Sequence, residues 1–325
     1  MAALSLKRFR GKVLLRYSTI RERKTHDGIR RILDHLDRLD VKSTRQLTDD
    51  LVMRFIQLRR EDGVCTNTII GELGRLKAIA NHAVEWGYLK KTPFRRGERL
   101  LRPEPKRQRS HLEVRDLSRL LGRLESEIRD AVDDDASRPY LRFRPFTARS
   151  EWRARRLFAL ASTFAFTGAR KLEVLYLQLV DVDLRKRILR IDPARRRLKT
   201  EGSARKVGIP AELAEVLEDW MPRTGCDWLF PGATGRGPWT GGMPGYKPLD
   251  AIKAACKRAG IADGGIHLFR HSFLTACEGW GVSREGAMRL TGITQEQTLE
   301  IYQHADEENL RGFVKGVTIR RVATS

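Results

Sequence analysis

Apolar residues recur every three to four positions from about residue 24 to residue 87, which predicts a small all-helical unit. The stretch THDGIRRILDHLDRL opens at the helix-capping residue Thr25, and TRQLTDDLVMRFIQLRRED repeats the pattern. A third stretch, CTNTIIGELGRLKAIANHAVEWGYL, carries an apolar stripe formed by Ile70, Leu73, Leu76, Ile79, Ala80 and Ala83. Stripes of this kind become buried when helices pack against one another.

A proline-rich basic stretch, KTPFRRGERLLRPEPKRQRS, follows the helical unit and predicts an extended linker. It either tethers two domains or lies along DNA phosphates, and its charge favours the second interpretation. We therefore expect a basic N-terminal segment over 1–20, a helical domain over 21–95, a linker over 96–110 and a larger domain over 111–325.

Helical patterns in the larger domain flank a short region of alternating apolar residues. Helices are predicted for HLEVRDLSRLLGRLES, EWRARRLFALASTFAFTGAR, AELAEVLEDWM, LDAIKAACKRAG, HLFRHSFLTACEGWG and SREGAMRLTG. The stretches ILRI and VGI predict short strands on either side of a loop around Glu201 and Gly202. RDAVDDDASRPYLRFRPFTARS predicts a loop. The expected fold class is mainly α with a small β-sheet.

Composition narrows the class of partner. The 325 residues are 41% hydrophobic, and 63 Lys and Arg against 41 Asp and Glu give a net charge of +22. A field of this sign attracts polyanions, and it favours nucleic acid over a membrane surface because no basic amphipathic segment stands alone. No stretch resembles a signal peptide or reaches the ~20 apolar residues of a membrane span, so we expect a cytoplasmic protein without a membrane partner.

The cysteines indicate neither a disulfide framework nor a metal site. None of the four forms a CxxC pair or has a histidine at metal-ligand spacing: Cys65, Cys226, Cys256 and Cys277. We therefore expect reduced thiols, no bound metal and no cofactor.

Five residues are candidates for chemistry: Arg170, Lys199, His267, Arg270 and Tyr302. His267 and Arg270 are three residues apart, which places a proton carrier and a fork-shaped guanidinium on one helix face. Taken alone, this HxxR pair is far more typical of an amphipathic helix with incidental basic residues. Arg170 follows a predicted helix end, where the carboxylate of Glu173 could orient it. Lys199 lies in the predicted loop between the two strands.

Together, four ordered segments resemble the tyrosine recombinase (phage integrase) family over about residues 20 to 310. TGARKLEVLYLQLVDVDL resembles its first arginine box, LKTEGSARKVGIP its β-hairpin lysine segment, IHLFRHSFLT its HxxR box, and TGITQEQTLEIYQHA its tyrosine box. The early helices resemble its core-binding domain. The resemblance implies an N-terminal helical core-binding domain of the SAM-like type and a C-terminal catalytic domain that together enclose duplex DNA.

The resemblance also implies a role for each matched residue. Tyr302 would attack the scissile phosphodiester, form a 3′-phosphotyrosyl link and release a 5′-hydroxyl. Arg170 and Arg270 would bind the non-bridging oxygens, Lys199 would protonate the leaving oxygen, and His267 would assist proton transfer. Such a site concentrates positive charge where the transition state is negative. Covalent storage of the bond energy makes ATP unnecessary.

One position departs from the family pattern. Ile293 follows Gly292 where the family usually has histidine or tryptophan, and its side chain cannot donate a hydrogen bond. Three interpretations follow: the site works at a reduced rate, Gln295 or Gln297 supplies the donor, or the protein binds DNA without cleaving it. The intact residues at the other five positions favour activity.

The implied function is site-specific recombination, with integration or excision of a mobile element as the typical setting. Four protomers would assemble on two specific double-stranded DNA sites, in the nucleoid of a prokaryote or during phage growth, and a directionality factor could take part. The alternatives are a type IB topoisomerase-like relaxase and a catalytically impaired DNA-binding relative. His271 and His304 receive no role, and the tail containing FVKGVTIRRV packs either on its own domain or on a neighbouring protomer.

Overall fold

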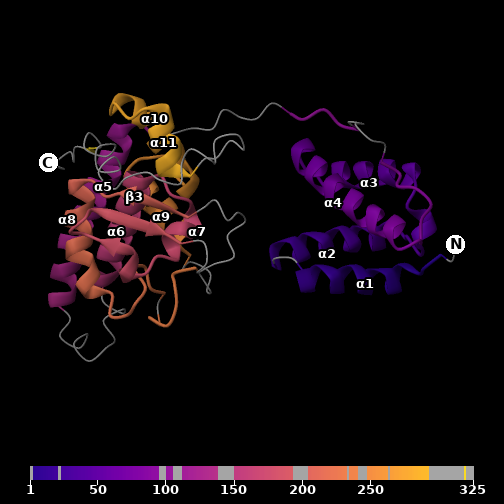
Figure 1. The fold of residues 1–325 in the computed structure, drawn as a ribbon, viewed down its shortest axis with the longest axis horizontal. Helices are drawn as coiled ribbons and strands as arrows, with labels where there is room; N and C mark the ends of the chain where they lie inside the picture. Colours follow the sequence, from indigo (N-terminus) through magenta and orange to yellow (C-terminus); the bar gives the residue numbers. More distant parts are fainter. Residues whose placement is uncertain are drawn as a thin grey trace. The chain divides into compact units, whose positions relative to one another are not determined.

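The chain forms two compact units, Met1–Arg107 and Gln108–Ser325, and Figure 1 shows the helices of both and the strands of the second. The boundary falls inside the predicted linker. The computed structural model describes residues 3–20, 23–94, 100–104, 112–137, 150–192, 204–232, 234–240, 247–262, 264–292 and 318–319.

The N-terminal unit is mainly helical in its described residues and has one apolar core. Its elements are α1 (Leu6–Ile20), α2 (Arg23–Arg38), the 3-10 turn η1 (Thr44–Gln46), α3 (Asp49–Glu61) and α4 (Thr66–Glu85). Helix α1 packs against α2, and α4 packs against both α2 and α3. The apolar periodicity therefore predicted this unit correctly.

Helix α1 belongs to this core, which corrects the expectation of a separate basic segment over 1–20. Its apolar residues Leu6, Phe9, Val13 and Tyr17 are all buried. Their spacing of three to four residues places them on one helix face. Basic residues separate these apolar positions, so the sequence did not predict a helix here. Lys and Arg are nevertheless good helix formers on an exposed face.

Two details of α2 and α4 also differ from the prediction. Helix α2 already includes Arg23, so Thr25 lies inside it and is not its cap. In α4 the buried residue is Ile69, whereas Ile70 is only partly buried. Ile69 precedes Leu73 by four residues, so it continues the stripe that faces the core.

Residues 100–104 contact the N-terminal unit, although they fall in the predicted extended linker. Leu100 and Leu101 are partly buried against its core. The side chain of Glu104 accepts a hydrogen bond from the Thr66 amide (3.0 Å), and its carbonyl accepts one from Asn67 Nδ2 (3.2 Å). A carboxylate at a helix N-terminus satisfies an amide that has no partner within the helix. Glu104 therefore holds residues 100–104 against the start of α4 through two hydrogen bonds.

The elements of the second unit surround one largely buried helix, α6. Its helices are α5 (Val114–Ala136), α6 (Ser150–Thr167), α7 (Lys171–Leu175), η4 (Leu179–Asp181), α8 (Ala211–Trp220), η7 (Met221–Arg223), α9 (Pro248–Arg258), α10 (Ile266–Gly279) and α11 (Arg284–Thr291). Helix α6 contacts α5, α7, α8, α9 and α10. Its second half, from Leu157 onward, has no charged residue on any side, which suits this central position, and twelve residues of the helix are buried.

A three-stranded antiparallel sheet lies in the same unit, with the order β1-β2-β3. Figure 1 labels its strand β3. Strand β1 is Val182–Asp183, β2 is Ile188–Ile191 and β3 is Arg205–Gly208. The two predicted strands are present, and β1 adds a short third. The pairing aligns Leu189 with Val207 and Ile191 with Arg205, so Arg205 lies on the sheet face that carries buried side chains. The mainly helical fold with a small sheet is confirmed.

Helix α5 is longer than predicted, because residues 129–136 continue it where a loop was expected. The loop prediction failed because the helix ends on a run of acidic residues without apolar periodicity. Near the C-terminus, Ile319 is fully buried in the core of its own unit. Its amide donates to Glu212 Oε1 of α8 (3.2 Å), as does the hydroxyl of Thr318. No helix in the described part of the chain is both long and apolar enough to span a membrane.

Candidate active site

Arg170 is placed by a sharp turn at the end of α6. Gly168 ends the helix with a φ of +57°, and a Cβ at this position would lie 2.6 Å from Phe273. Only glycine fits both the left-handed backbone and the close contact. Arg170 then forms the N-cap of α7. Its amide donates to Glu173 Oε2 (2.8 Å), and its Nη1 donates to Glu173 Oε1 (2.9 Å), so the carboxylate orients this arginine as the sequence suggested.

Glu173 is a buried carboxylate shared by two arginines. Besides Arg170, Arg205 of β3 donates from Nη2 to Oε2 (2.8 Å) and from Nη1 to Oε1 (3.2 Å). The side chains of Glu173 and Arg205 are only 1% and 9% exposed. Burial by itself would raise the pKa of Glu173, but the hydrogen bonds and charge of Arg205, with those of Arg170, lower it to about 2. Glu173 is therefore ionised at neutral pH.

Arg270 projects from α10, whose buried Ile266, Phe269 and Phe273 hold the helix against the core. Its Nη1 donates to the carbonyls of Gly168 (3.0 Å) and Thr291 (2.6 Å). Burial and the neighbouring charges of Arg170 and Arg205 lower the pKa of Arg270 to about 10, so it remains charged at neutral pH.

The carboxyl-terminal turn of α11 brings these arginines together. Three consecutive carbonyls there each accept a hydrogen bond from a different arginine: Leu290 from Arg205 Nε (3.0 Å), Thr291 from Arg270 Nη1 (2.6 Å) and Gly292 from Arg170 Nη2 (2.8 Å). The last carbonyls of a helix lack intrahelical partners and carry partial negative charge, which cations stabilise. We call Arg170, Arg205 and Arg270 the arginine cap of α11.

His267 lies in the first turn of α10, three residues before Arg270, and its side chain is exposed. It makes no hydrogen bond or ion pair with any described residue. An imidazole in this state can engage an incoming ligand.

The structure thus brings together Arg170 and Arg270 and leaves His267 accessible on the helix that carries Arg270. Lys199, Ile293 and Tyr302 lie outside the described residues. Described residues adjoin them: Arg205 follows Lys199 by six positions, and Gly292 directly precedes Ile293.

Sequence reasoning missed Arg205. A signal was present, because Arg205 and Val207 are two residues apart in a strand and therefore share a face. Val207 is an apolar core residue, so an arginine on the same face needs a buried acidic partner. The sequence could not identify Glu173 as that partner.

The chemistry of this site suits an anion. Three guanidinium groups meet at the end of α11, and one carboxylate, Glu173, pairs with two of them. Hydrogen bonds within the described residues engage only Nη1 of Arg270, which leaves its Nε and Nη2 for acceptor oxygens. No group of three His, Cys, Asp or Glu side chains in the described part of the chain could hold a metal ion. The four cysteines are unpaired thiols, and burial raises the pKa of Cys256 to about 11.

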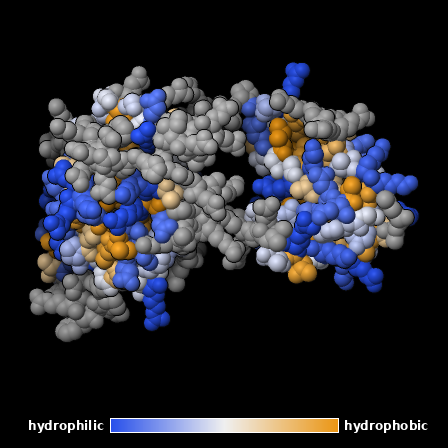
Figure 2. Space-filling model, viewed as in Figure 1, coloured by the Kyte–Doolittle hydropathy of each residue, from blue (hydrophilic) through white to orange (hydrophobic). Residues whose placement is uncertain are grey.

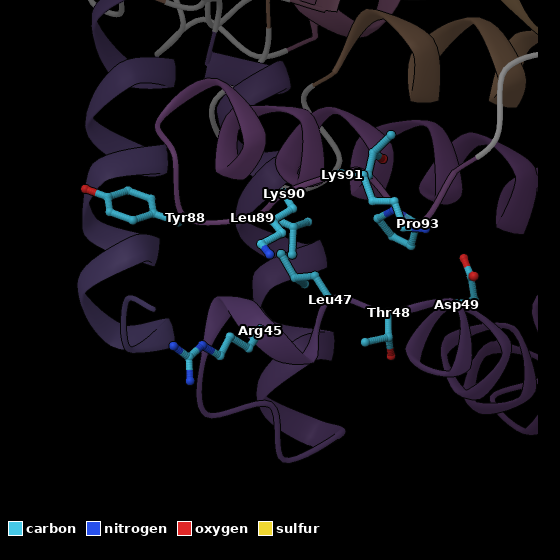
Figure 3. Close-up of a pocket in the computed structure, with 10 residues that line it drawn as sticks. Arg45, Leu47, Thr48, Asp49, Tyr88, Leu89, Lys90, Lys91 and Pro93 are labelled. Atoms are coloured by element: carbon cyan, nitrogen blue, oxygen red, sulfur yellow. The ribbon is translucent and has the colours of Figure 1, made fainter. Parts of the chain in front are cut away.

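The N-terminal unit has a separate basic pocket of about 690 Å³, shown in Figure 3. It lies where the segment after α4 passes the start of α3. Arg45, Lys90 and Lys91 line it together with Thr48, the N-cap of α3. Figure 2 shows that hydrophilic side chains cover much of the visible face of each unit, with smaller hydrophobic areas between them.

Two of three comparisons relate this chain to known proteins. The model of the phage integrase family matches residues 147–309, which is half of the chain. No curated protein matches the chain. The fold resembles the Tn1549 transposon integrase in complex with a circular intermediate DNA, at 16% identity and a TM-score of 0.66, over 95% of this chain and 98% of that chain.

A complex of the same integrase with transposon right end DNA gives 17% identity and a TM-score of 0.64, over 95% and 98% of the two chains. A lambda integrase dimer bound to a COC′ core site gives 14% identity and a TM-score of 0.62, over 93% and 98%. The family match covers the segments that carry Arg170, Arg205 and Arg270, and the fold agrees. The chain belongs to the phage integrase family and has the tyrosine recombinase fold.

Proposed function

We propose that this protein is a site-specific DNA recombinase that cuts and rejoins DNA through a 3′-phosphotyrosyl intermediate. The convergence of Arg170 and Arg270 at the end of α11 carries this proposal. These residues are 100 positions apart, yet they donate to adjacent carbonyls. The chain that leaves this point reaches Tyr302 ten residues later.

In the proposed reaction, Tyr302 loses its hydroxyl proton and its oxygen attacks the scissile phosphorus. The phosphorus–oxygen bond to the 5′-oxygen breaks, and Lys199 supplies the proton that this leaving oxygen takes up. Arg170 and Arg270 bind the non-bridging oxygens, where negative charge increases in the transition state. His267 takes up the proton that Tyr302 loses. Attack of a 5′-hydroxyl on the phosphotyrosine reverses these steps and joins the strands.

Glu173 supports this role without contacting the substrate. A tyrosine with a pKa near ~10 needs neighbouring cations to act as a nucleophile at neutral pH. Because the carboxylate of Glu173 is ionised and buried, it holds Arg170 in one orientation before DNA arrives. Such preorganisation is the main way in which a site stabilises a charged transition state.

Duplex DNA is the proposed substrate. The net charge of +22 favours a phosphate backbone, and the integrases with a similar fold were solved with DNA. The pocket with Arg45, Lys90 and Lys91 offers phosphate contacts in the N-terminal unit. Assembly of four protomers on two sites, in the bacterial nucleoid or during phage growth, completes the proposal.

Capture of the covalent intermediate tests the proposal. Nicked duplexes made from the DNA at the boundaries of the element that carries the gene would trap a protein–DNA adduct. We expect an adduct with the wild type and none with Tyr302→Phe, which keeps the ring and removes the nucleophile. An adduct with Tyr302→Phe, or none with the wild type on any boundary sequence, would refute the assignment.

The same assay distinguishes the other functions. Relaxation of a plasmid without a boundary sequence by a monomer would indicate a topoisomerase-like relaxase. If Ile293→His forms an adduct on DNA that the wild type binds without cleaving, the protein is a catalytically impaired relative. An adduct with the wild type shows that the site tolerates Ile293.

A further inference from the structure

Arg205 differs from the other two members of the arginine cap. The side chain of Arg170 is 46% exposed, whereas that of Arg205 is 9% exposed. Both terminal nitrogens of Arg205 are directed at Glu173 and its Nε at the carbonyl of Leu290. An arginine committed in this way is not available to a DNA phosphate, so any effect on the reaction must be exerted through its neighbours.

Those neighbours belong to two parts of the proposed active site. Through Glu173, Arg205 contacts the carboxylate that orients Arg170. Through Leu290, it holds the last turn of α11, from which the chain continues to Tyr302. Glu173 precedes Arg205 by 32 positions in the chain, and Leu290 follows it by 85 positions.

The backbone at Gly292 fits against the guanidinium of Arg205. Gly292 has a φ of 63° and ends α11 in the left-handed conformation. A Cβ at this position would lie 2.8 Å from Nη1 of Arg205 and 3.0 Å from its Cζ. The planar group therefore packs directly on the main chain where the tyrosine segment begins. Arg205 also begins β3, directly after the stretch that contains Lys199.

We propose that Arg205 is a positioning residue with two effects. It sets the orientation of Arg170, and it sets the position of the α11 end at Gly292, from which the chain continues to Tyr302. The proposal rests on the recombinase function for its chemical consequence. A guanidinium is suited to this role because its rigid fork meets three acceptors on two elements at once. An ammonium group at the same place carries the charge but cannot reproduce that geometry.

Hydrogen exchange of the full-length protein tests the positioning itself without DNA. In Arg205→Met we expect amide exchange to increase about tenfold or more in peptides that contain Arg170 and Gly292, relative to peptides from the α5–α6 core. Arg205→Lys should affect the Gly292 peptide more than the Arg170 peptide, because the charge near Glu173 remains. Arg190→Met is the matched control, since Arg190 lies on the neighbouring strand with a half-exposed side chain.

Two outcomes of the exchange experiment would overturn the proposal. Exchange within twofold of wild type in both peptides would show that Arg205 holds neither element. An equal increase across the core would show that it only stabilises the unit as a whole. If Arg205→Met does not fold, the different effects of Arg205→Lys on the two peptides decide the question.

The chemical consequence is tested with two nicked boundary duplexes, one with a normal scissile phosphodiester and one with a neutral methylphosphonate. The methylphosphonate lacks one charged oxygen and so depends less on an arginine clamp. We expect Arg205→Met to slow adduct formation by ~100-fold on the phosphodiester, as a displaced catalytic group does, and by less than tenfold on the methylphosphonate.

A loss of folded protein would instead lower both rates by the same factor, and this result would refute the positioning role. If the wild type forms no adduct, the proposed function fails, while the exchange experiment still decides whether Arg205 positions α7 and α11.

Discussion

The ion pair between Glu173 and Arg205 makes the stability of the C-terminal unit depend on pH in a way that one substitution should remove. Glu173→Gln keeps the size of the side chain and an acceptor oxygen but removes the charge. The guanidinium of Arg205 then stays buried without its carboxylate, which is a costly change in a protein interior.

The size of the effect follows from the pKa of Glu173. Its ordinary value is 4.5 and its value in the folded protein is about 2. At ~1.36 kcal/mol for each tenfold change in proton affinity, the ionised carboxylate stabilises the fold by about 3 kcal/mol. Because the folded pKa is the lower one, this contribution is complete above pH 4.5 and is lost as the pH falls through 2.

Urea unfolding of wild type and Glu173→Gln between pH 7 and pH 3 measures this difference. Five of the six tryptophans lie in the C-terminal unit, so their fluorescence mainly reports its unfolding. At pH 7 we expect the unfolding free energy of Glu173→Gln to be about 3 kcal/mol lower than that of the wild type. This difference should stay unchanged down to about pH 5 and become smaller below it. The control is Asp219→Asn, whose carboxylate pairs with Arg155 and Arg223 but is 43% exposed.

Asp219→Asn should lower the unfolding free energy by only about 0.5 kcal/mol, because solvent screens exposed pairs. A gap for Glu173→Gln below ~1 kcal/mol at pH 7, or one of constant size down to pH 3, would show that the buried pair does not stabilise the fold as argued.

Three further outcomes are expected. Gly168→Ala should destabilise the C-terminal unit by about 2 kcal/mol or more in urea unfolding, since the new Cβ meets Phe273 in a left-handed backbone; an unchanged midpoint would contradict this. Gly74→Ala in α4, where nothing lies within 4 Å of the added Cβ, should stabilise the N-terminal unit by about 0.5–1 kcal/mol in thermal unfolding. Replacing Lys90 and Lys91 by alanine should weaken DNA binding and lower the slope of log affinity against log salt by about 1–2 in a filter-binding titration; an unchanged slope would place DNA elsewhere.

Much of the fold was readable from local periodicity. The stripe in α4 and the apolar run of α6 predicted helices that the structure contains, because a helix face repeats every 3.6 residues within one stretch of chain. The same reasoning failed where charged residues broke the pattern, as in α1 and the end of α5. In both places, packing and helix propensity extend the helix beyond the apolar signal.

The candidate site was readable only as separate segments. The motifs around Arg170, His267 and Arg270 pointed to the family, and the family match confirms the resemblance. The roles assigned to these residues, and to Lys199 and Tyr302, stay predictions. The involvement of Glu173 with Arg170 was expected because three residues separate them at a helix start, a relation that local geometry determines.

By itself, then, the sequence determined most of the helices, the basic charge and the family, since each depends on residue types at short spacing. Only the tertiary structure decided that Arg205 faces inward to Glu173, and that three arginines meet successive carbonyls at the end of α11. The bond from Arg170 to Gly292 spans 122 residues. A contact of that range depends on how α6, α10 and β3 pack, and no local pattern encodes it.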